Sequence, residues 1–360
     1  LLNLTSSSTG ALSGTLKLDN ATLRLKGQLD VPLVGDSTAQ LTIARRGLPS
    51  VLVDLTITDT AGDGILSGSV MLVAPGALPV PLNGARHPWS KAITATDFAG
   101  YYTAAIQQPS VDPLLPQGTG YFTIKALTTG RATWAGKLAD GTAFTGSSYF
   151  WQDDGLPMYL SLYKGKGSLM GTATGFEPVA PSPLRIVGGS LSWLKQPQTT
   201  RTYAAGLEFP ALPISGSEYI PPDKGLIVLG LTDPGTGGTN ATIAFTGGNL
   251  ESADYFADLM QDFRITTAHK GIFADLTTGN PAGVRLTSLN PATGLFTGSC
   301  VLKDPNPVKL ESRTVPYYGV ILQAQEYGEG FALVGELSAP PIPASRMPQQ
   351  SGRVTLTPKP

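Results

Sequence analysis

The sequence has very little of the chemistry on which most enzymes depend. Its 360 residues include one cysteine, Cys300, and only two histidines. A single cysteine excludes an intramolecular disulfide, and the three residues lie too far apart to show the ligand spacing of a zinc site. No serine stands in the G-x-S-x-G pattern of a nucleophile elbow. His87 and His269 lie in "GARHPW" and "TAHKG", which are typical of turns or strand ends.

Charge is also scarce. Charged residues make up 14% of the chain and the formal net charge is -1. This excludes a strong field that would attract nucleic acid or an acidic membrane surface. No run of 18 apolar residues is present, so no transmembrane helix is predicted. The chain shows no signal peptide and begins at Leu1 rather than methionine, which predicts a processed or truncated N-terminus.

Glycine and proline are abundant, with 43 and 30 residues, and hydrophobic residues reach 41%. The dominant pattern is an alternation of apolar and polar side chains, as in "ATLRLKGQLD" (21–30) and "SVLVDLTITD" (50–59). A period of two places one face of a strand in the core and the other in water. Turn signals such as "ADGT" (139–142) separate these runs roughly every 10–14 residues. The chain is therefore predicted to be all-β, with antiparallel strands.

One stretch has a helical period instead. In "NLESADYFADLMQDF" (249–263), Phe256, Leu259, Met260 and Phe263 fall on one face of a helix. This spacing predicts one short helix near 250–262.

A short G-x-x-x-G pattern occurs four times, each time before an extended run: 9–19, 62–72, 165–175 and 293–304. Its second glycine is predicted to let the backbone bend or bulge where a small sheet curls over. Longer alignments support a repeat at a nearly constant offset. The first two units align at offsets of 104 to 110 residues: 26–30 with 136–140, 47–55 with 155–163, and Trp89 with Trp193. The third copy is fainter, and its segment 284–302 aligns with 53–72 at about twice that offset.

The repeats predict three units with boundaries 1–110, 111–232 and 233–360. Each is expected to contain about eight antiparallel strands. Small meander barrels or tightly curled sandwiches fit this strand spacing, because closure removes the exposed edges of a long meander.

Several Gly-aromatic and turn motifs occur in a recognisable order. They are "AGYYTA" (99–104), "PQGTGYFTI" (116–124), "GKLADGT" (136–142), "PMYLSLYKGKGSLMG" (157–171), "GGSLSW" (188–193), "TGLFTGS" (293–299) and the ending "YYGVILQ…GEGFALV…SGRVTL" (317–356). Together they resemble a C-terminal β-rich module of large secreted or surface proteins from Verrucomicrobia and related bacteria. The resemblance implies an extracellular or cell-surface location, modular architecture and a larger region ahead of Leu1. It carries over no functional residue.

The leading hypothesis is a non-enzymatic structural or adhesive module of a bacterial surface or matrix protein. The terminal strands "LLNLTSS" (1–7) and "SGRVTLTP" (351–358) are predicted to pair with neighbouring chains by strand addition. The partners expected are the protein itself or a surface polysaccharide. No cofactor is expected; calcium is the one metal considered, at the acidic loops 58–64 and 152–155.

Two alternatives remain open at this point. The first is a glycan-binding module, with Tyr149, Trp151, Asp153 and Asp154 as the contact residues, because sugar rings stack on flat aromatic faces. The second is a hydrolase with a carboxylate pair that includes Asp153 or Asp154.

Two tyrosines that follow these residues, Tyr159 and Tyr163, are not predicted to contact a glycan. Tyr159 and Tyr163 align with Val51 and Leu55 on the apolar face of the first unit. They are therefore predicted to be core residues whose hydroxyls reach the barrel rim.

Overall fold

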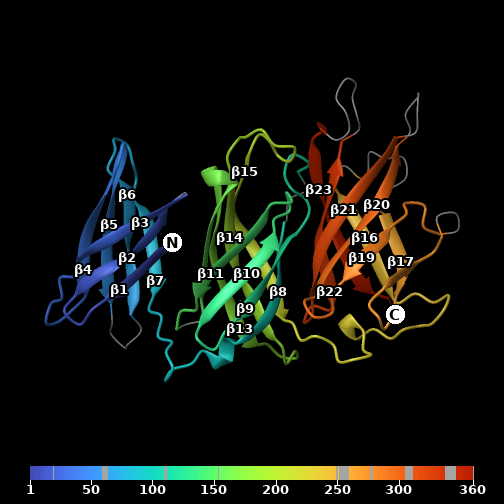
Figure 1. Ribbon diagram of the computed structural model, residues 1–360, viewed down its shortest axis with the longest axis horizontal. Helices are drawn as coiled ribbons and strands as arrows, with labels where there is room; N and C mark the ends of the chain where they lie inside the picture. The colour runs from blue at the N-terminus through green and yellow to red at the C-terminus, as the bar shows by residue number, and fades with distance from the viewer. Residues whose placement is uncertain are drawn as a thin grey trace.

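The computed structural model is built almost entirely of β-strands, as the alternation predicts. Figure 1 shows three β-units following one another along the chain. Within the described residues, short 3₁₀ turns interrupt the strands, as at η1 (Thr96–Phe98), η2 (Tyr163–Gly165) and η3 (Val228–Gly230). The structure describes residues 1–18, 20–58, 64–108, 112–152, 154–248, 250, 259–275, 279–304, 311–336 and 346–359. Within these residues no helix is long and apolar enough to cross a membrane.

The first unit contains seven strands rather than the predicted eight. They form a three-stranded sheet, β1-β2-β3, and a four-stranded sheet, β4-β5-β6-β7. The strands are β1 (Leu2–Ser6), β2 (Ala11–Leu18), β3 (Ala21–Gln28), β4 (Ser37–Arg45), β5 (Leu48–Thr58), β6 (Ile65–Leu72) and β7 (Val80–Ala85). A single antiparallel bridge, Asp30 to Thr38, joins the two sheets. Their inward leucines, valines and isoleucines form a core of their own.

The second unit is an eight-stranded antiparallel sheet that is nearly closed. Its order is β11-β10-β9-β8-β15-β14-β13-β12, so the first and last strands, β8 and β15, pair with each other. The strands are β8 (Gly100–Ile106), β9 (Gly120–Ala126), β10 (Arg131–Lys137), β11 (Ala143–Tyr149), β12 (Leu156–Leu162), β13 (Gly167–Pro178), β14 (Arg185–Lys195) and β15 (Leu207–Glu218). Strands β11 and β12 lie next to each other at the seam without a ladder.

The third unit repeats this architecture with another eight strands, in the order β18-β17-β16-β23-β22-β21-β20-β19. Again the first and last strands pair, here β16 with β23. The strands are β16 (Ala241–Gly247), β17 (Leu259–Ile265), β18 (Gly271–Phe273), β19 (Arg285–Leu289), β20 (Leu295–Asp304), β21 (Glu311–Leu322), β22 (Tyr327–Gly335) and β23 (Gln349–Pro358).

The predicted short helix near 250–262 is wrong where the structure describes it. Leu259 to Ile265 is strand β17, with Leu259, Phe263 and Ile265 buried and Met260 exposed. A spacing of four residues between Leu259 and Phe263 fits both a helical face and one face of a strand. Residues 251–258, including Phe256, lie outside the described residues.

The second and third units pack into one continuous body. Val320, Leu322 and Phe331 belong to the third sheet, yet they lie in the hydrophobic cluster of the second. Thr119 donates a hydrogen bond to the buried carboxylate of Glu329 across the junction (3.0 Å). The predicted boundary at 110/111 falls after β8, which belongs to the second sheet.

The second glycine of each G-x-x-x-G stretch lies where a neighbouring strand comes unusually close. A Cβ atom at these positions would lie 1.9–2.1 Å from a backbone carbonyl oxygen of the paired strand, which no side chain tolerates. The pairs are Gly14 with Asn3, Gly68 with Asp54, Gly171 with Ser190, and Gly298 with Arg285. Close backbone approach therefore explains why glycine recurs there.

Candidate functional site

Strand direction leaves the first unit open between β1 and β7. Every strand pair in the unit is antiparallel, so with seven strands in succession the first and the last run in the same direction. In the eight-stranded units the first and last strands run in opposite directions and close the sheet with an antiparallel ladder. Completing the first unit in the same way requires one more strand, antiparallel to both β1 and β7.

The residues around this opening are incompletely buried. Neither β1 nor β7 contains a buried residue. Leu2 and Leu4 of β1, Leu66 of β6 and Leu82 of β7 are only half-buried, although they pack against the core of the unit. An added strand with apolar side chains at alternate positions would remove more of this surface from water.

The free edge of β1 has a defined hydrogen-bonding pattern. The Leu1 carbonyl accepts the N–H of Lys17 (2.8 Å), and the N–H of Ser7 donates to the Ala11 carbonyl (3.0 Å). Paired positions alternate along an antiparallel strand, so odd-numbered residues face β2 and even-numbered residues direct their N–H and C=O groups outward. Ser6 is the last outward-facing position of β1, and its side chain is exposed.

The opposite edge, β7, is less suited to strand addition. Pro81 lies within β7 and has no N–H to donate. Proline is one of the devices by which edge strands resist unwanted pairing. Beside it, the hairpin between β6 and β7 exposes an apolar group formed by Leu72, Val73, Leu78 and Val80. The geometry therefore favours a ladder to β1, with apolar contacts on the side of β7.

The C-terminal strand has no free edge of this kind. Strand β23, which contains the stretch 351–358, pairs with β16 on one side and with β22 on the other. Val354 and Leu356 are completely buried between them. The prediction that this terminal strand pairs with neighbouring chains is therefore wrong, because both of its edges are already paired. Of the two terminal strands, only β1 has a free edge.

The predicted glycan contacts lie at the end of β11 and in the loop after it. Tyr149 is 45% exposed, and its ring meets that of His87 edge-on at a centroid distance of 4.2 Å. Trp151 is half-buried, and its backbone N–H donates to the Gly155 carbonyl (2.8 Å). Asp154 is also half-buried, with a φ of 63°, whereas Asp153 lies outside the described residues.

A buried polar network that the sequence patterns did not reveal lies in the second unit. The Lys195 ammonium forms an ion pair with Asp140 (2.9 Å), and both side chains are almost fully buried. The Tyr163 hydroxyl donates to the same carboxylate oxygen, Asp140 Oδ2 (2.9 Å), and accepts from the Trp193 indole N–H (2.9 Å). Burial, followed by the charge of Asp140, raises the pKa of Tyr163. Every group has a partner, which is the pattern of a structural network rather than a reactive site.

Several other groups that carry chemistry are ion-paired or buried. Glu218 pairs with Arg185, and Asp233 pairs with Arg264. Burial raises the pKa of the Cys300 thiol to about 12, so the reactive thiolate is scarce at neutral pH. The described part of the chain holds no group of three or more His, Cys, Asp or Glu residues that could bind a metal. Residues 59–63 of the first predicted calcium loop lie outside it.

No family model matches the sequence, and neither a curated protein nor a solved structure is detectably similar to it.

Proposed function

We propose that the protein is a non-enzymatic structural and adhesive module that joins other polypeptides by accepting an extended strand at the free edge of β1. The observation that carries this proposal is the seven-strand first unit, which stands beside two nearly closed units whose first and last strands pair. The resemblance to modules of large secreted or surface proteins supports an extracellular or cell-surface location.

The opening defines the chemistry of the donor. A ladder to β1 supplies main-chain hydrogen bonds, and alternate side chains of the donor enter the unit to cover Leu4, Leu66 and Leu82. The donor is therefore an extended segment with apolar residues at every second position and no proline among the residues that pair. Main-chain pairing gives the affinity, and the alternating pockets give the specificity.

A peptide from the chain itself serves as the probe. Strand β23 without its terminal proline, residues 349–357, already bridges two neighbouring strands in the third unit and directs Val354 and Leu356 inward. We expect a fluorescent peptide of this sequence to bind the full chain saturably in an anisotropy titration. A control peptide with Val354→Ser and Leu356→Ser should bind much more weakly, because it lacks the apolar side chains.

Two proline variants locate the binding edge. Ser6→Pro removes an outward-facing N–H from β1 and is expected to weaken peptide binding about tenfold, through one lost hydrogen bond and the bulk of the ring. Ser8→Pro is the matched control. Residues 7–10 form a turn in which the Gly10 N–H donates to the Ser7 carbonyl (3.0 Å). Ser8 is the second residue of this turn, a position that favours proline. Equal binding by the two variants, or no binding by the unaltered chain, would refute the proposal.

Light scattering of the chain alone at increasing concentration then identifies the donor class. A mass that grows with concentration and is reduced by Ser6→Pro shows that a second copy donates the strand. A constant monomer mass, with peptide binding retained, shows that the donor is a different polypeptide.

A further inference from the structure

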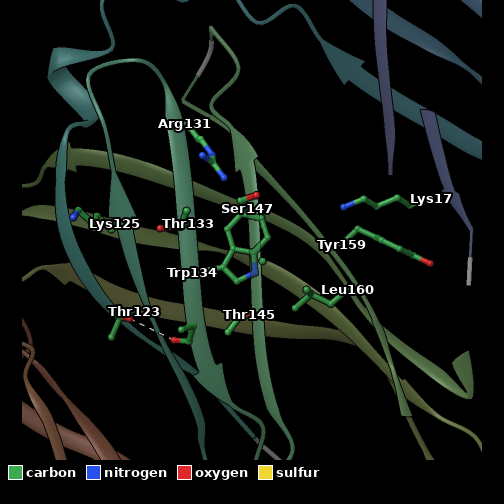
Figure 2. Close-up of a pocket in the computed structure, with 12 residues that line it drawn as sticks. Lys17, Thr123, Lys125, Arg131, Thr133, Trp134, Thr145, Ser147, Tyr159 and Leu160 are labelled. Carbon is green, nitrogen blue, oxygen red and sulfur yellow. Dashed lines mark hydrogen bonds between the residues drawn. The ribbon is translucent and has the colours of Figure 1, made fainter. Parts of the chain in front are cut away.

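An open hollow of about 570 Å³ lies on the outer side of the second unit, across the seam between β11 and β12 (Figure 2). Strands β9 to β12 form most of it, and β2 of the first unit contributes one side. Its lining is Lys17, Thr123, Lys125, Arg131, Thr133, Trp134, Ala135, Thr145, Gly146, Ser147, Tyr159 and Leu160. The hollow is therefore built from two units of the molecule.

The lining carries charge of one sign. Lys17, Lys125 and Arg131 contribute three positive groups, and no aspartate or glutamate is among the lining residues. In Figure 2 the ammonium group of Lys17 extends from the first unit toward the hollow, opposite Arg131 and Lys125 on the second. This contrasts with the chain as a whole, whose net charge is -1. A local concentration of cations in a nearly neutral protein attracts an acidic ligand to this place.

Hydroxyl groups and aromatic rings make up the rest of the surface. Thr133, Thr145 and Ser147 belong to adjacent strands, and Tyr159 lies across the seam. The prediction that Tyr159 is a core residue is wrong, because its side chain is only half-buried and lines the hollow, whereas that of its neighbour Met158 is buried. Hydroxyls both donate and accept hydrogen bonds, as sugar hydroxyls do, and a tyrosine ring offers a flat face on which a sugar ring packs. Tyr149, one of the residues predicted to contact a glycan, is the register partner of Arg131 and so adjoins the hollow.

The floor of the hollow contains an unpaired polar group. Trp134 is 3% exposed, and its indole N–H has no hydrogen-bond partner among the described residues. Gly146 lies directly against it, because a Cβ atom there would be 2.5 Å from the indole nitrogen. Trp134 and Gly146 both line the hollow. A buried donor that lacks a partner is uncommon and needs an explanation.

We propose that this hollow binds a short stretch of an acidic polysaccharide. Carboxylate or sulfate groups of the ligand pair with Arg131, Lys125 and Lys17, while its hydroxyls bond to the threonine and serine side chains. The volume falls within the range of small-molecule sites and suits a few sugar rings. Hydroxyls outnumber cations in the lining, which favours a polysaccharide over a nucleic acid, whose binding depends on a dense array of positive charge.

Calorimetric titration of the full chain tests this with four defined ligands. Oligomers of mannuronate and guluronate carry carboxylates, heparin oligosaccharides carry sulfates, dextran oligomers are neutral, and oligo-deoxythymidine is a nucleic acid. We expect at least one acidic oligosaccharide to bind, with an affinity that falls as salt is raised, and dextran to show no binding. Binding of dextran equal to that of the acidic sugars, or tighter binding of oligo-deoxythymidine, would overturn the proposal.

Substitutions then assign the site. Lys125→Ala with Arg131→Ala should weaken binding of the acidic sugar at least tenfold, and Lys17→Ala should weaken it severalfold. Lys166→Ala is the control, because Lys166 is an exposed lysine of the same unit outside the hollow. Unchanged affinity in the double variant refutes the site. Ser6→Pro should leave sugar binding intact, and the double variant should still bind the strand peptide, so the two proposals fail or stand separately.

Discussion

The first unit and the two units that follow it differ by one strand, and this difference decides whether the first and last strands of a unit can pair antiparallel. Eight antiparallel strands bring the first and last strands together in opposite directions, as in β8 with β15 and β16 with β23. Seven strands leave β1 and β7 running the same way, without a ladder between them. A unit with an odd number of antiparallel strands in succession therefore cannot join its first and last strands by an antiparallel ladder.

The units also differ in the contacts that join each one to its neighbour. The second and third share apolar residues, and the second also contains the buried ion pair of Asp140 with Lys195. The first unit keeps its own small core and touches the second through the hydrogen bond between Ser161 and Asn20 (2.7 Å). We therefore expect the first unit to open at a lower free energy than the rest of the chain.

The largest effect is expected from truncating a residue that both closed units share. Phe331→Ala removes a completely buried ring from the joint core and should lower the free energy of unfolding by about 3–5 kcal/mol. Leu66→Ala, at a half-buried site of the first unit, should cost about 1 kcal/mol because much of its surface is already in water. Urea unfolding of both variants measures the contrast, which equal costs would contradict.

The buried ion pair sharpens the same comparison. Lys195→Ala leaves the Asp140 carboxylate buried without its cation, although Tyr163 still donates to it. We expect a loss of about 3 kcal/mol in the free energy of unfolding. Lys166→Ala, an exposed lysine in the same unit, should change it by less than about 0.5 kcal/mol. Chemical denaturation followed by tryptophan fluorescence measures both, and a mild effect of Lys195→Ala would show that the network relaxes or admits water.

The order of opening provides a third test. Cys300 is buried in the third unit, so a thiol reagent should modify it only when that unit unfolds. Backbone amides of β1 and β7 should exchange completely under conditions in which Cys300 still resists modification. Their protection factors should be at least tenfold lower than those of amides in β8 and β23. Simultaneous loss of protection in all three units would show that the chain unfolds as one body.

The smallest effect concerns pH. Hydrogen bonds from Arg264 lower the pKa of Asp233 from 3.8 to about 2. Because the folded-state value is the lower one, the pair stabilises the fold above pH 3.8, and this contribution is lost as the pH falls from 3.8 through about 2. Asp233→Asn should flatten the pH dependence of the melting temperature in this window: the variant melts slightly lower than the unaltered chain at pH 7, and the two converge near pH 2. An identical acid profile in the variant would show that the pair does not contribute.

Much of this architecture could be predicted from local patterns, and the error at β17 shows where such patterns fail. Leu259 and Phe263 suit a helix and a strand equally well, and Met260 decides between them, because a helix would bury it whereas the strand exposes 65% of it. The sequence predicts strand addition at both chain ends, but of the two terminal strands only β1 has a free edge. Which neighbour pairs with a strand depends on residues far away in the sequence, as for β23 between β16 and β22.

The hollow illustrates the same limit. The sequence pattern predicts Tyr149 as a contact residue. It does not predict that Lys17, Lys125 and Arg131 meet, because they lie on separate strands of two units. The sequence by itself determined that the chain forms amphipathic antiparallel strands, because side-chain alternation and turn residues act over a few neighbouring positions. Only the tertiary structure decided how many strands each unit contains, which edge stays free and which cations meet, because these depend on pairing between distant segments.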